Sequence, residues 1–173
     1  ILVNSGWSGR KNTFESISDE DWDYDIEVCL NGPFRTIKAA VPLLKQRQGN
    51  ILTIASMYGH VAPDYRMYDS EKLANSPSYG AGKAGVIQMT RYLASFLSPH
   101  GIRANCICPG LVATPMTRDF MAQKEVMADI IKDYPMGRFG KPQEVSDMIA
   151  FLLSDDAASI TGAVLTADGG YSL

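Results

Sequence analysis

The sequence is poor in residues that several classes of protein depend on. Its 173 residues include three cysteines and two histidines. A small, odd number of cysteines argues against a disulfide framework and favours a reducing compartment, so we expect a cytoplasmic protein. Cys106 and Cys108 have no second pair of Cys or His residues near them in the sequence, and we therefore expect no metal site.

Long apolar runs and clusters of one charge are also missing. No apolar run approaches the roughly 18 residues that a membrane-spanning helix needs. The 16 Lys and Arg residues are interspersed with 19 Asp and Glu residues, for a net charge of −3, whereas nucleic-acid-binding proteins carry clustered basic residues. The chain is 46% hydrophobic, which is enough for a folded core. We predict one domain, residues 1–173, that binds neither nucleic acid nor a membrane.

Short apolar runs alternate with longer amphipathic segments. The runs at 1–3, 50–55, 102–107 and 163–166 are nearly continuous, as is typical of strands buried on both faces. Helical segments separate them, so the pattern predicts an α/β fold with parallel strands and crossover helices. Other helices are predicted at 78–97 and from Pro142. The first helix is predicted to begin after Ser18 and to kink or break at Pro33 and Pro42. It is also predicted to bury one apolar face, which consists of Trp22, Ile26, Leu30, Phe34, Ile37, Val41 and Leu44.

The helix at 78–97 carries the strongest chemical signal. Its first turns are rich in glycine and alanine; glycine costs helix propensity, so we expect close packing there against another backbone or a flat ligand. Tyr79 and Lys83 are four residues apart and share one face. An ammonium beside a phenol lowers the pKa of the phenol, which suits proton exchange between an alcohol and a carbonyl. Tyr68 and Lys72 have the same spacing, but Pro77 follows too soon for a long helix to carry them.

Further motifs follow the predicted strands at the ends where open α/β sheets bind ligands. Ser56 comes directly after the strand at 50–55. The other motifs are Asn4-Ser5-Gly6 after the first strand, Pro109-Gly110-Leu111-Val112-Ala113-Thr114 after the third, and Asp168-Gly169-Gly170 near the C-terminus. In these motifs and their order, the sequence resembles the classical short-chain dehydrogenase/reductase family over essentially all of its length.

The resemblance implies a fold and an activity. The fold would be a Rossmann-like, doubly wound parallel sheet, of which this chain would hold about four strands with flanking helices. With NAD or NADP, the protein would interconvert a secondary alcohol and a ketone of a small-molecule substrate. Tyr79 would be the acid/base, Lys83 would lower its pKa and hold the nicotinamide ribose, and Ser56 would bind the substrate oxygen. The cofactor would also contact Asn4, Ser5, Gly6, Pro109, Gly110, Val112 and Thr114, and the substrate would contact Met57, Tyr58 and Met116.

The resemblance also implies a mobile lid over the substrate, formed by residues 116–134. As family members usually do, the protein would form a homodimer or homotetramer. The glycine-rich turn that binds the cofactor phosphates, with the βαβαβ segment around it, would precede Ile1. The chain would thus represent the C-terminal two-thirds of such an enzyme.

Two departures from the family pattern lie within the chain. Cys29 occupies the place of an Asn that helps the family hold a proton-relay water; it is either a small buried apolar residue or part of a compensated catalytic arrangement. The segment 59–77, between Ser56 and Tyr79, is longer than usual. It is either a substrate-side loop suited to a hydroxylated substrate, such as a sugar or polyol derivative, or a solvated insertion.

Two alternative functions stay open at this point. A truncated or degenerate family member could persist as a non-catalytic oligomerising or binding module, consistent with Cys29 and the missing glycine-rich turn. The same Tyr-Lys pair could also serve epimerisation or dehydration, although the Asp168-Gly169-Gly170 ending is more similar to that of the classical reductases. Cofactor titration and replacement of Tyr79 by Phe would separate these hypotheses.

Overall fold

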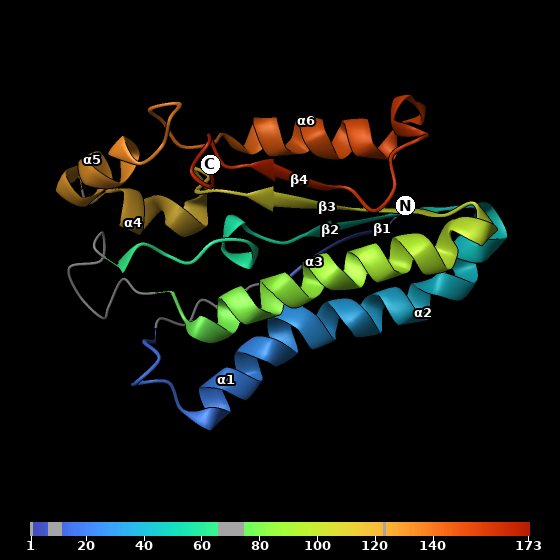
Figure 1. The fold of residues 1–173 in the computed structure, drawn as a ribbon, viewed down its shortest axis with the longest axis horizontal. Helices are drawn as coiled ribbons and strands as arrows, with labels where there is room; N and C mark the ends of the chain where they lie inside the picture. The colour runs from blue at the N-terminus through green and yellow to red at the C-terminus, as the bar shows by residue number, and fades with distance from the viewer. Residues whose placement is uncertain (1, 7–11, 66–74, 123) are drawn as a thin grey trace.

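A single parallel sheet lies between two layers of helices. The computed structural model describes residues 2–6, 12–65, 75–122 and 124–173 (Figure 1). Within these residues, the strands are β1 (Leu2–Ser5), β2 (Asn50–Ile54), β3 (Arg103–Pro109) and β4 (Val164–Ala167), hydrogen-bonded in that order and all parallel. The predicted Rossmann-like fold class is confirmed, and the predicted strand boundaries are within two residues of those observed.

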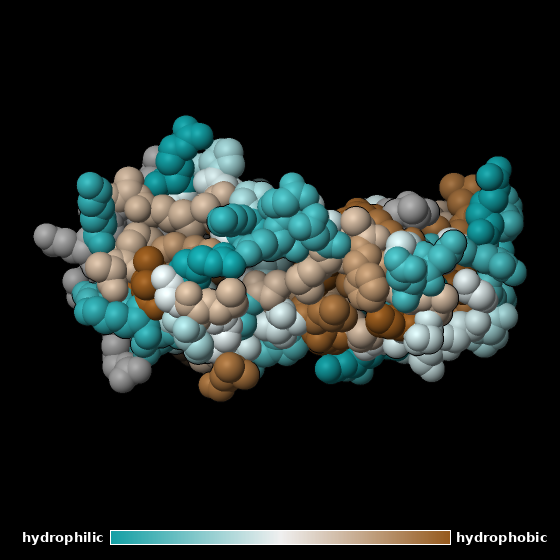
Figure 2. All heavy atoms as spheres, turned by 90° about the horizontal axis from the view of Figure 1, so that it is seen from above, coloured by the Kyte–Doolittle hydropathy of each residue, from teal (hydrophilic) through white to brown (hydrophobic). Residues whose placement is uncertain are grey.

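The helices that cover the two faces are clearly separated. Helices α2 (Gly32–Arg47) and α3 (Pro77–Leu97) cover one face, and α6 (Pro142–Leu153) covers the other (Figure 1). Neighbouring residues of β2 face opposite layers: Ile51 packs in the cluster of α2 and α3, whereas Leu52 packs against Leu152 of α6. Figure 2 shows the α6 face, where apolar surface gathers toward the end of α6 that carries the half-exposed Phe151.

The first predicted helix is a run of three segments: α1 (Asp19–Ile26), a π-helical turn η1 (Glu27–Asn31), and α2. Ser18 caps α1, as predicted, because its hydroxyl accepts the N–H of Asp21 at 3.1 Å. Pro42 does not break the helix, since α2 continues to Arg47. Pro42 is exposed, so water can satisfy the carbonyl that it leaves without a donor.

The buried face of this run differs from the predicted one. Trp22 and Phe34 were expected inside but are 36% and 49% exposed. Ile37 and Leu44 are buried, as predicted, and the other buried residues of the three segments are Asp25, Cys29 and Pro33. The π-helical turn is the reason: the amide of Gly32 bonds to the carbonyl of Glu27, five residues back instead of four. The predicted face assumed an uninterrupted α-helix.

The small residues of α3 allow close helix packing, as predicted. A Cβ atom at Gly82 would lie 2.8 Å from the Cβ of Cys29, and one at Gly85 would lie 2.9 Å from a methyl group of Leu30. The neighbour of α3 along this side is therefore the backbone of α1 and η1. Gly59 contacts α3 from the opposite direction, since a Cβ there would lie 3.0 Å from the carbonyl carbon of Lys83.

Short elements follow the carboxyl ends of the strands. Residues after β2 form the 3-10 turn η2 (Met57–Gly59), and those after β3 form η6 (Pro115–Thr117), α4 (Arg118–Met121) and α5 (Lys124–Lys132). Two further 3-10 turns, η5 (Ser98–His100) and η7 (Asp155–Ala157), lie at the opposite end of the sheet. Among the described residues, the structure has no helix of the length and apolarity needed to cross a membrane.

Candidate active site

Ser56 lies at the carboxyl end of β2, where the chain leaves the sheet. Its backbone is extended and its hydroxyl accepts the N–H of Tyr58 at 3.2 Å, which begins η2. The side chain is buried. The end of the strand and this turn together direct the Ser56 hydroxyl toward the first turn of α3.

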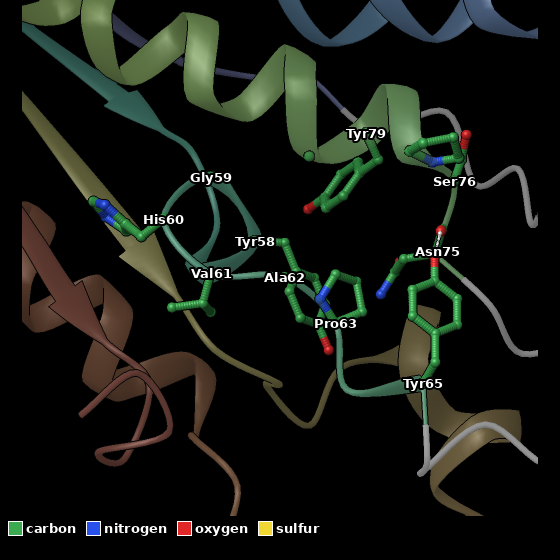
Figure 3. A pocket seen from close by; sticks show the side chains of 12 residues that line it. Tyr58, Gly59, His60, Val61, Ala62, Pro63, Tyr65, Asn75, Ser76 and Tyr79 are labelled. Atoms are coloured by element: carbon green, nitrogen blue, oxygen red, sulfur yellow. Dashed lines mark hydrogen bonds between the residues drawn. The ribbon is translucent and has the colours of Figure 1, made fainter. Parts of the chain in front are cut away.

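Tyr79 lies in that first turn. Helix α3 begins with Pro77 after Ser76, and the amide of Tyr79 bonds to the carbonyl of Ser76 at 3.1 Å. The Tyr79 ring extends from α3 toward η2 (Figure 3), and the Ser56 side chain lies near enough to act on the Tyr79 hydroxyl. The structure therefore brings together two of the three predicted catalytic groups.

Lys83, one helical turn further, is 2% exposed. Its Nζ donates to the carbonyl oxygen of Ile54 at 3.0 Å and lies 5.6 Å from the centroid of the Tyr79 ring. An ammonium has three N–H donors, and among the described residues one acceptor is provided, the Ile54 carbonyl. Two donors thus remain for a ligand at the carboxyl end of the sheet.

The protonation of Tyr79 differs from the sequence expectation. Burial raises the pKa of Tyr79 to about 12, and the hydrogen bond from Ser56 offsets this only in part. Burial therefore dominates the pKa of Tyr79 in this structure, and its lowering by Lys83 stays a prediction. Burial also lowers the pKa of Lys83 itself. The phenol is thus protonated at neutral pH.

All three cysteines lie around this pair. Cys29, Cys106 and Cys108 are fully buried and form no disulfide. All three act electrostatically on Lys83, and Cys29 and Cys108 also act on Tyr79. Hydrogen bonding between the two β3 thiols lowers the pKa of Cys106 and raises that of Cys108. The sequence motifs relate only Cys29 to the site. Because Cys106 and Cys108 are two residues apart on a strand, their spacing could have indicated that both face the same helix.

The residues predicted to contact a cofactor lie at the same edge of the sheet. Gly6 follows β1 and lies so close to η1 that a Cβ added to it would be 2.3 Å from the carbonyl oxygen of Val28. Gly110 lies equally close to Asp168, because a Cβ added to Gly110 would be 2.8 Å from the Cα of Asp168. Val112 forms an isolated parallel bridge with Gly140, and the amide of Thr114 donates to the Thr117 hydroxyl at 3.0 Å. The side chains of Asn4 and Met116 lie outside the described part of the structure, as do Tyr68 and Lys72.

A cavity of about 280 Å³ opens beside Tyr79 (Figure 3). The segment after η2 and the first turn of α3 line it, and the Tyr65 hydroxyl donates to the Asn75 carbonyl at 3.2 Å across its rim. Tyr58, predicted to contact the substrate, lines the cavity. Met57, predicted to do the same, is 1% exposed, and its sulfur accepts from the Tyr134 hydroxyl at 3.8 Å, inside the core. Both substrate contacts stay predictions.

Within the described ranges, no three His, Cys, Asp or Glu side chains lie close enough together to hold a metal ion. The polar groups that converge at the carboxyl ends of the strands are a serine, a tyrosine and a lysine. These groups can hydrogen-bond an oxygen atom and move a proton to or from it.

Comparison with known proteins identifies the family. A family model described as enoyl-(acyl carrier protein) reductase matches residues 1–172. The 3-oxoacyl-(acyl-carrier-protein) reductase FabG of Thermotoga maritima is 38% identical over 171 residues, which cover 98% of this chain and 65% of that protein. The oxidoreductase UcpA of Salmonella typhimurium is 32% identical over 180 residues, covering 100% of this chain and 65% of that protein.

Solved structures agree with these relatives. A short chain dehydrogenase from Leptospira borgpetersenii with bound NAD+ is 32% identical, with a TM-score of 0.86, over 99% of this chain and 65% of that one. A candidate 2-deoxy-D-gluconate 3-dehydrogenase from Agrobacterium tumefaciens with bound NADP is 30% identical, also with a TM-score of 0.86. The match covers 98% of this chain and 66% of that one. The chain thus spans about 65% of the length of the curated relatives it matches. By sequence and by fold, this chain belongs to the short-chain dehydrogenase/reductase family.

Proposed function

We propose that this chain forms, as a single domain over residues 1–173, the catalytic part of an NAD(P)-dependent oxidoreductase that interconverts a secondary alcohol and a ketone. The observation that carries the proposal is the approach of the Tyr79 and Ser56 side chains to one another, with the buried Lys83 ammonium one helical turn away. The three groups come from two elements, the end of β2 and the start of α3. Their meeting point is the edge of the sheet where this fold class binds its ligands.

The residues at this edge fit a nicotinamide dinucleotide. Lys83 keeps two N–H donors beyond the Ile54 carbonyl, suited to a ribose hydroxyl pair. Ser5, Gly6 and the segment from Pro109 to Thr114 would border the cofactor on its other sides. When bound, the nicotinamide gives or takes the hydride. The relatives that were solved with NAD+ and with NADP support this cofactor class.

The proton step belongs to Tyr79. In the direction of reduction, the neutral phenol gives its proton to the carbonyl oxygen as the carbonyl carbon gains the hydride, and an alcohol forms. In the reverse direction, the phenolate takes the proton of the alcohol as the hydride leaves. Ser56 hydrogen-bonds the same oxygen and stabilises the charge that develops on it. The raised pKa of Tyr79 favours the protonated phenol, the form that reduction requires.

The cavity beside Tyr79 supports a small hydroxylated substrate, such as a sugar or polyol derivative. Its volume of about 280 Å³ suits a small molecule, and its lining includes Tyr58, Tyr65, His60 and the Asn75 side chain. The Agrobacterium neighbour is a candidate dehydrogenase of a sugar acid. The curated relatives that reduce acyl-carrier-protein thioesters represent the competing substrate class. A panel of polyols, sugar acids and 3-oxoacyl thioesters would decide between the two.

Oligomer and location are part of the same proposal. We expect a homodimer or homotetramer, supported by the exposed aromatic side chains Phe34, Tyr92 and Phe96 on the helical layer of α2 and α3. We expect the cytoplasm, because all three thiols are buried without a disulfide.

Replacement of Tyr79 by Phe tests the activity directly. In the full-length protein, Tyr79→Phe should abolish hydride transfer, followed by nicotinamide absorbance, while the melting temperature and cofactor binding stay near those of the unmodified protein. Tyr92→Phe is the matched control, because Tyr92 lies on the same helix but is 64% exposed and stacks on Phe96. Full turnover by the Tyr79→Phe variant would refute the proposal. Absence of nicotinamide binding by the unmodified protein would favour the non-catalytic alternative.

A further inference from the structure

Asp25 is a fully buried carboxyl group that the proposed reaction does not use. It lies in α1 and is 0% exposed. The Ser78 hydroxyl donates to its Oδ2, and the Ser76 and Ser78 hydroxyls hydrogen-bond each other. Both serines are buried as well. The other oxygen, Oδ1, is buried without a hydrogen-bond partner among the described residues. Burial of an incompletely bonded carboxyl group costs free energy, so we looked for what offsets it.

The carboxyl group lies at the N-terminal end of α3. Ser76 is the N-cap residue of this 21-residue helix but makes no side-chain capping hydrogen bond, and Ser78 is the second residue of the helix. The N-terminus of a helix carries partial positive charge and favours an acidic group. Pro77, at the first helical position, has no N–H to satisfy. Asp25 thus joins α1 to the turn that carries Tyr79, through a hydroxyl one residue before it.

Asp25 is the polar end of a longer contact between the two helical runs. Ser78 meets Asp25, Gly82 meets Cys29 and Gly85 meets Leu30. These contacts follow one another in the same direction along both runs. Tyr79 and Lys83 each come one residue after a contact position, so they are turned by about 100° about the axis of α3. The contact therefore fixes the rotation of α3, and with it the direction of both site residues.

We propose that Asp25 is a positioning residue for Tyr79, which it holds in place against Ser56 through the hydrogen bond with Ser78. The inference rests on the proposed oxidoreductase function for its kinetic test, but not for its spectroscopic one. Because a displacement of about 1 Å at a reacting group costs on the order of a hundredfold in rate, loss of this link should be visible in turnover.

The test compares four single variants of the full-length protein, and the double variant of Asp25→Ala with Ser78→Ala. Asp25→Ala and Ser78→Ala remove the two sides of the link. Asp25→Asn keeps an oxygen that can accept from Ser78 and supplies an amide at the unpartnered position. Asp23→Asn is the control, because Asp23 is an exposed acidic residue of the same helix. Should Asp25→Ala not fold, Ser78→Ala removes only one hydroxyl group and carries the test alone.

We expect Asp25→Ala and Ser78→Ala to lower kcat at least tenfold, with the KM for the cofactor changed less than twofold. The double variant should be no slower than the slower single variant, since both remove the same link. Asp25→Asn should stay within threefold of the unmodified protein, and Asp23→Asn within twofold. Unchanged kcat in Asp25→Ala and Ser78→Ala would overturn the proposal. So would an Asp25→Asn variant as slow as Asp25→Ala, because charge rather than the acceptor would then be what matters.

A measurement independent of activity separates this proposal from the proposed function. The ionisation of Tyr79 can be followed by NMR of ¹³C-labelled tyrosine, assigned with Tyr79→Phe. Release of the first turn of α3 should admit water and lower the pKa of Tyr79 from about 12 toward 10, by at least one pH unit in Asp25→Ala. If the unmodified protein has no turnover but this shift occurs, the proposed function fails and the positioning role stands. An unshifted titration would overturn the positioning role whatever the activity.

Discussion

The Nζ of Lys83 bonds to the Ile54 carbonyl at 3.0 Å and not to the phenol of Tyr79, one helical turn away on the same face. The ammonium is thereby held at the end of β2, between the strand and the residues that follow it. Because burial disfavours the charged form of Lys83, we expect this charge to benefit a ligand rather than the fold.

Replacement of Lys83 by Met should therefore separate activity from stability. Methionine has a similar length and no charge, and exchange of a buried charge for an apolar side chain is often neutral or stabilising. We expect the melting temperature of Lys83→Met to equal or exceed that of the unmodified protein near pH 7, while turnover falls at least a hundredfold. Calorimetry and initial rates give the two quantities. A variant that loses stability and activity together would show that Lys83 holds the fold.

The raised pKa of Tyr79 predicts a loss of stability in alkali. The phenol ionises near pH 10 in the unfolded chain but only at about 12 when folded. Between these values the folded state binds more protons, so the free energy of unfolding falls as pH rises from 10 to 12, by about 2 to 3 kcal/mol in all. Below pH 10 the contribution is fully present. Urea titrations at pH 9, 10 and 11 on the unmodified protein and on Tyr79→Phe would measure it, since only the former should show this slope.

The two close glycine contacts of α3 should respond differently to alanine. At Gly82 the new Cβ would meet the Cβ of Cys29 at 2.8 Å, an atom fixed to the backbone of η1, whereas at Gly85 it would meet the movable methyl groups of Leu30 at 2.9 and 3.0 Å. Alanine also gains up to about 1 kcal/mol in helix propensity. We expect Gly82→Ala to lower the free energy of unfolding by about 1 to 2 kcal/mol, and Gly85→Ala to change it by less than about 0.5 kcal/mol. Equal effects in chemical denaturation would contradict this interpretation of the packing.

Glu144 predicts a loss of stability in acid. Arg138 binds both carboxylate oxygens, at 2.6 and 3.0 Å, and the N–H of Lys141 adds a bond at 2.8 Å at the start of α6; together they lower the pKa of Glu144 to about 2. The contribution is present above the ordinary pKa of 4.5 and is lost as pH falls toward 2. Glu144→Gln should therefore be less stable than the unmodified protein at pH 6 and similar to it at pH 2. Thermal melts at the two pH values check this, with Gln143→Ala as the exposed neighbouring control.

The sequence predicted the layout of the fold because its strands and helices differ in length and periodicity. The runs at 50–55 and 102–107 are short and continuously apolar, and each became a buried central strand. The motif residues Ser56 and Tyr79 could be related to one edge of the sheet, because all strands are parallel and their carboxyl ends coincide. The approach of these two side chains follows from that topology.

Other features could not be predicted because they depend on three-dimensional packing. The buried face of the first helical run depends on the π-helical turn at Glu27–Asn31, and the sequence of these residues does not predict that turn. The raised pKa of Tyr79 depends on how deeply the phenol is buried, whereas the prediction considered only a neighbouring charge. In the sequence, Asp25 is one of several acids near Trp22, and only its burial distinguishes it from Asp23.

The π-helical turn lets the first helical run hold one residue more than a regular helix would need to keep the same buried face. Buried residues at 25, 29, 33 and 37 recur every four positions, a spacing that would advance by about 40° per step around a regular α-helix. The wider turn between Glu27 and Asn31 absorbs this drift. Deletion of one residue there would restore a regular helix with the two faces still aligned, because the eleven steps left between Asp25 and Ile37 come to about 20° beyond three full turns. Loss of the π-helical turn without a deletion would instead rotate α1 by about 100° relative to α2, and Asp25 would turn away from Ser78 while every residue of α1 kept its identity.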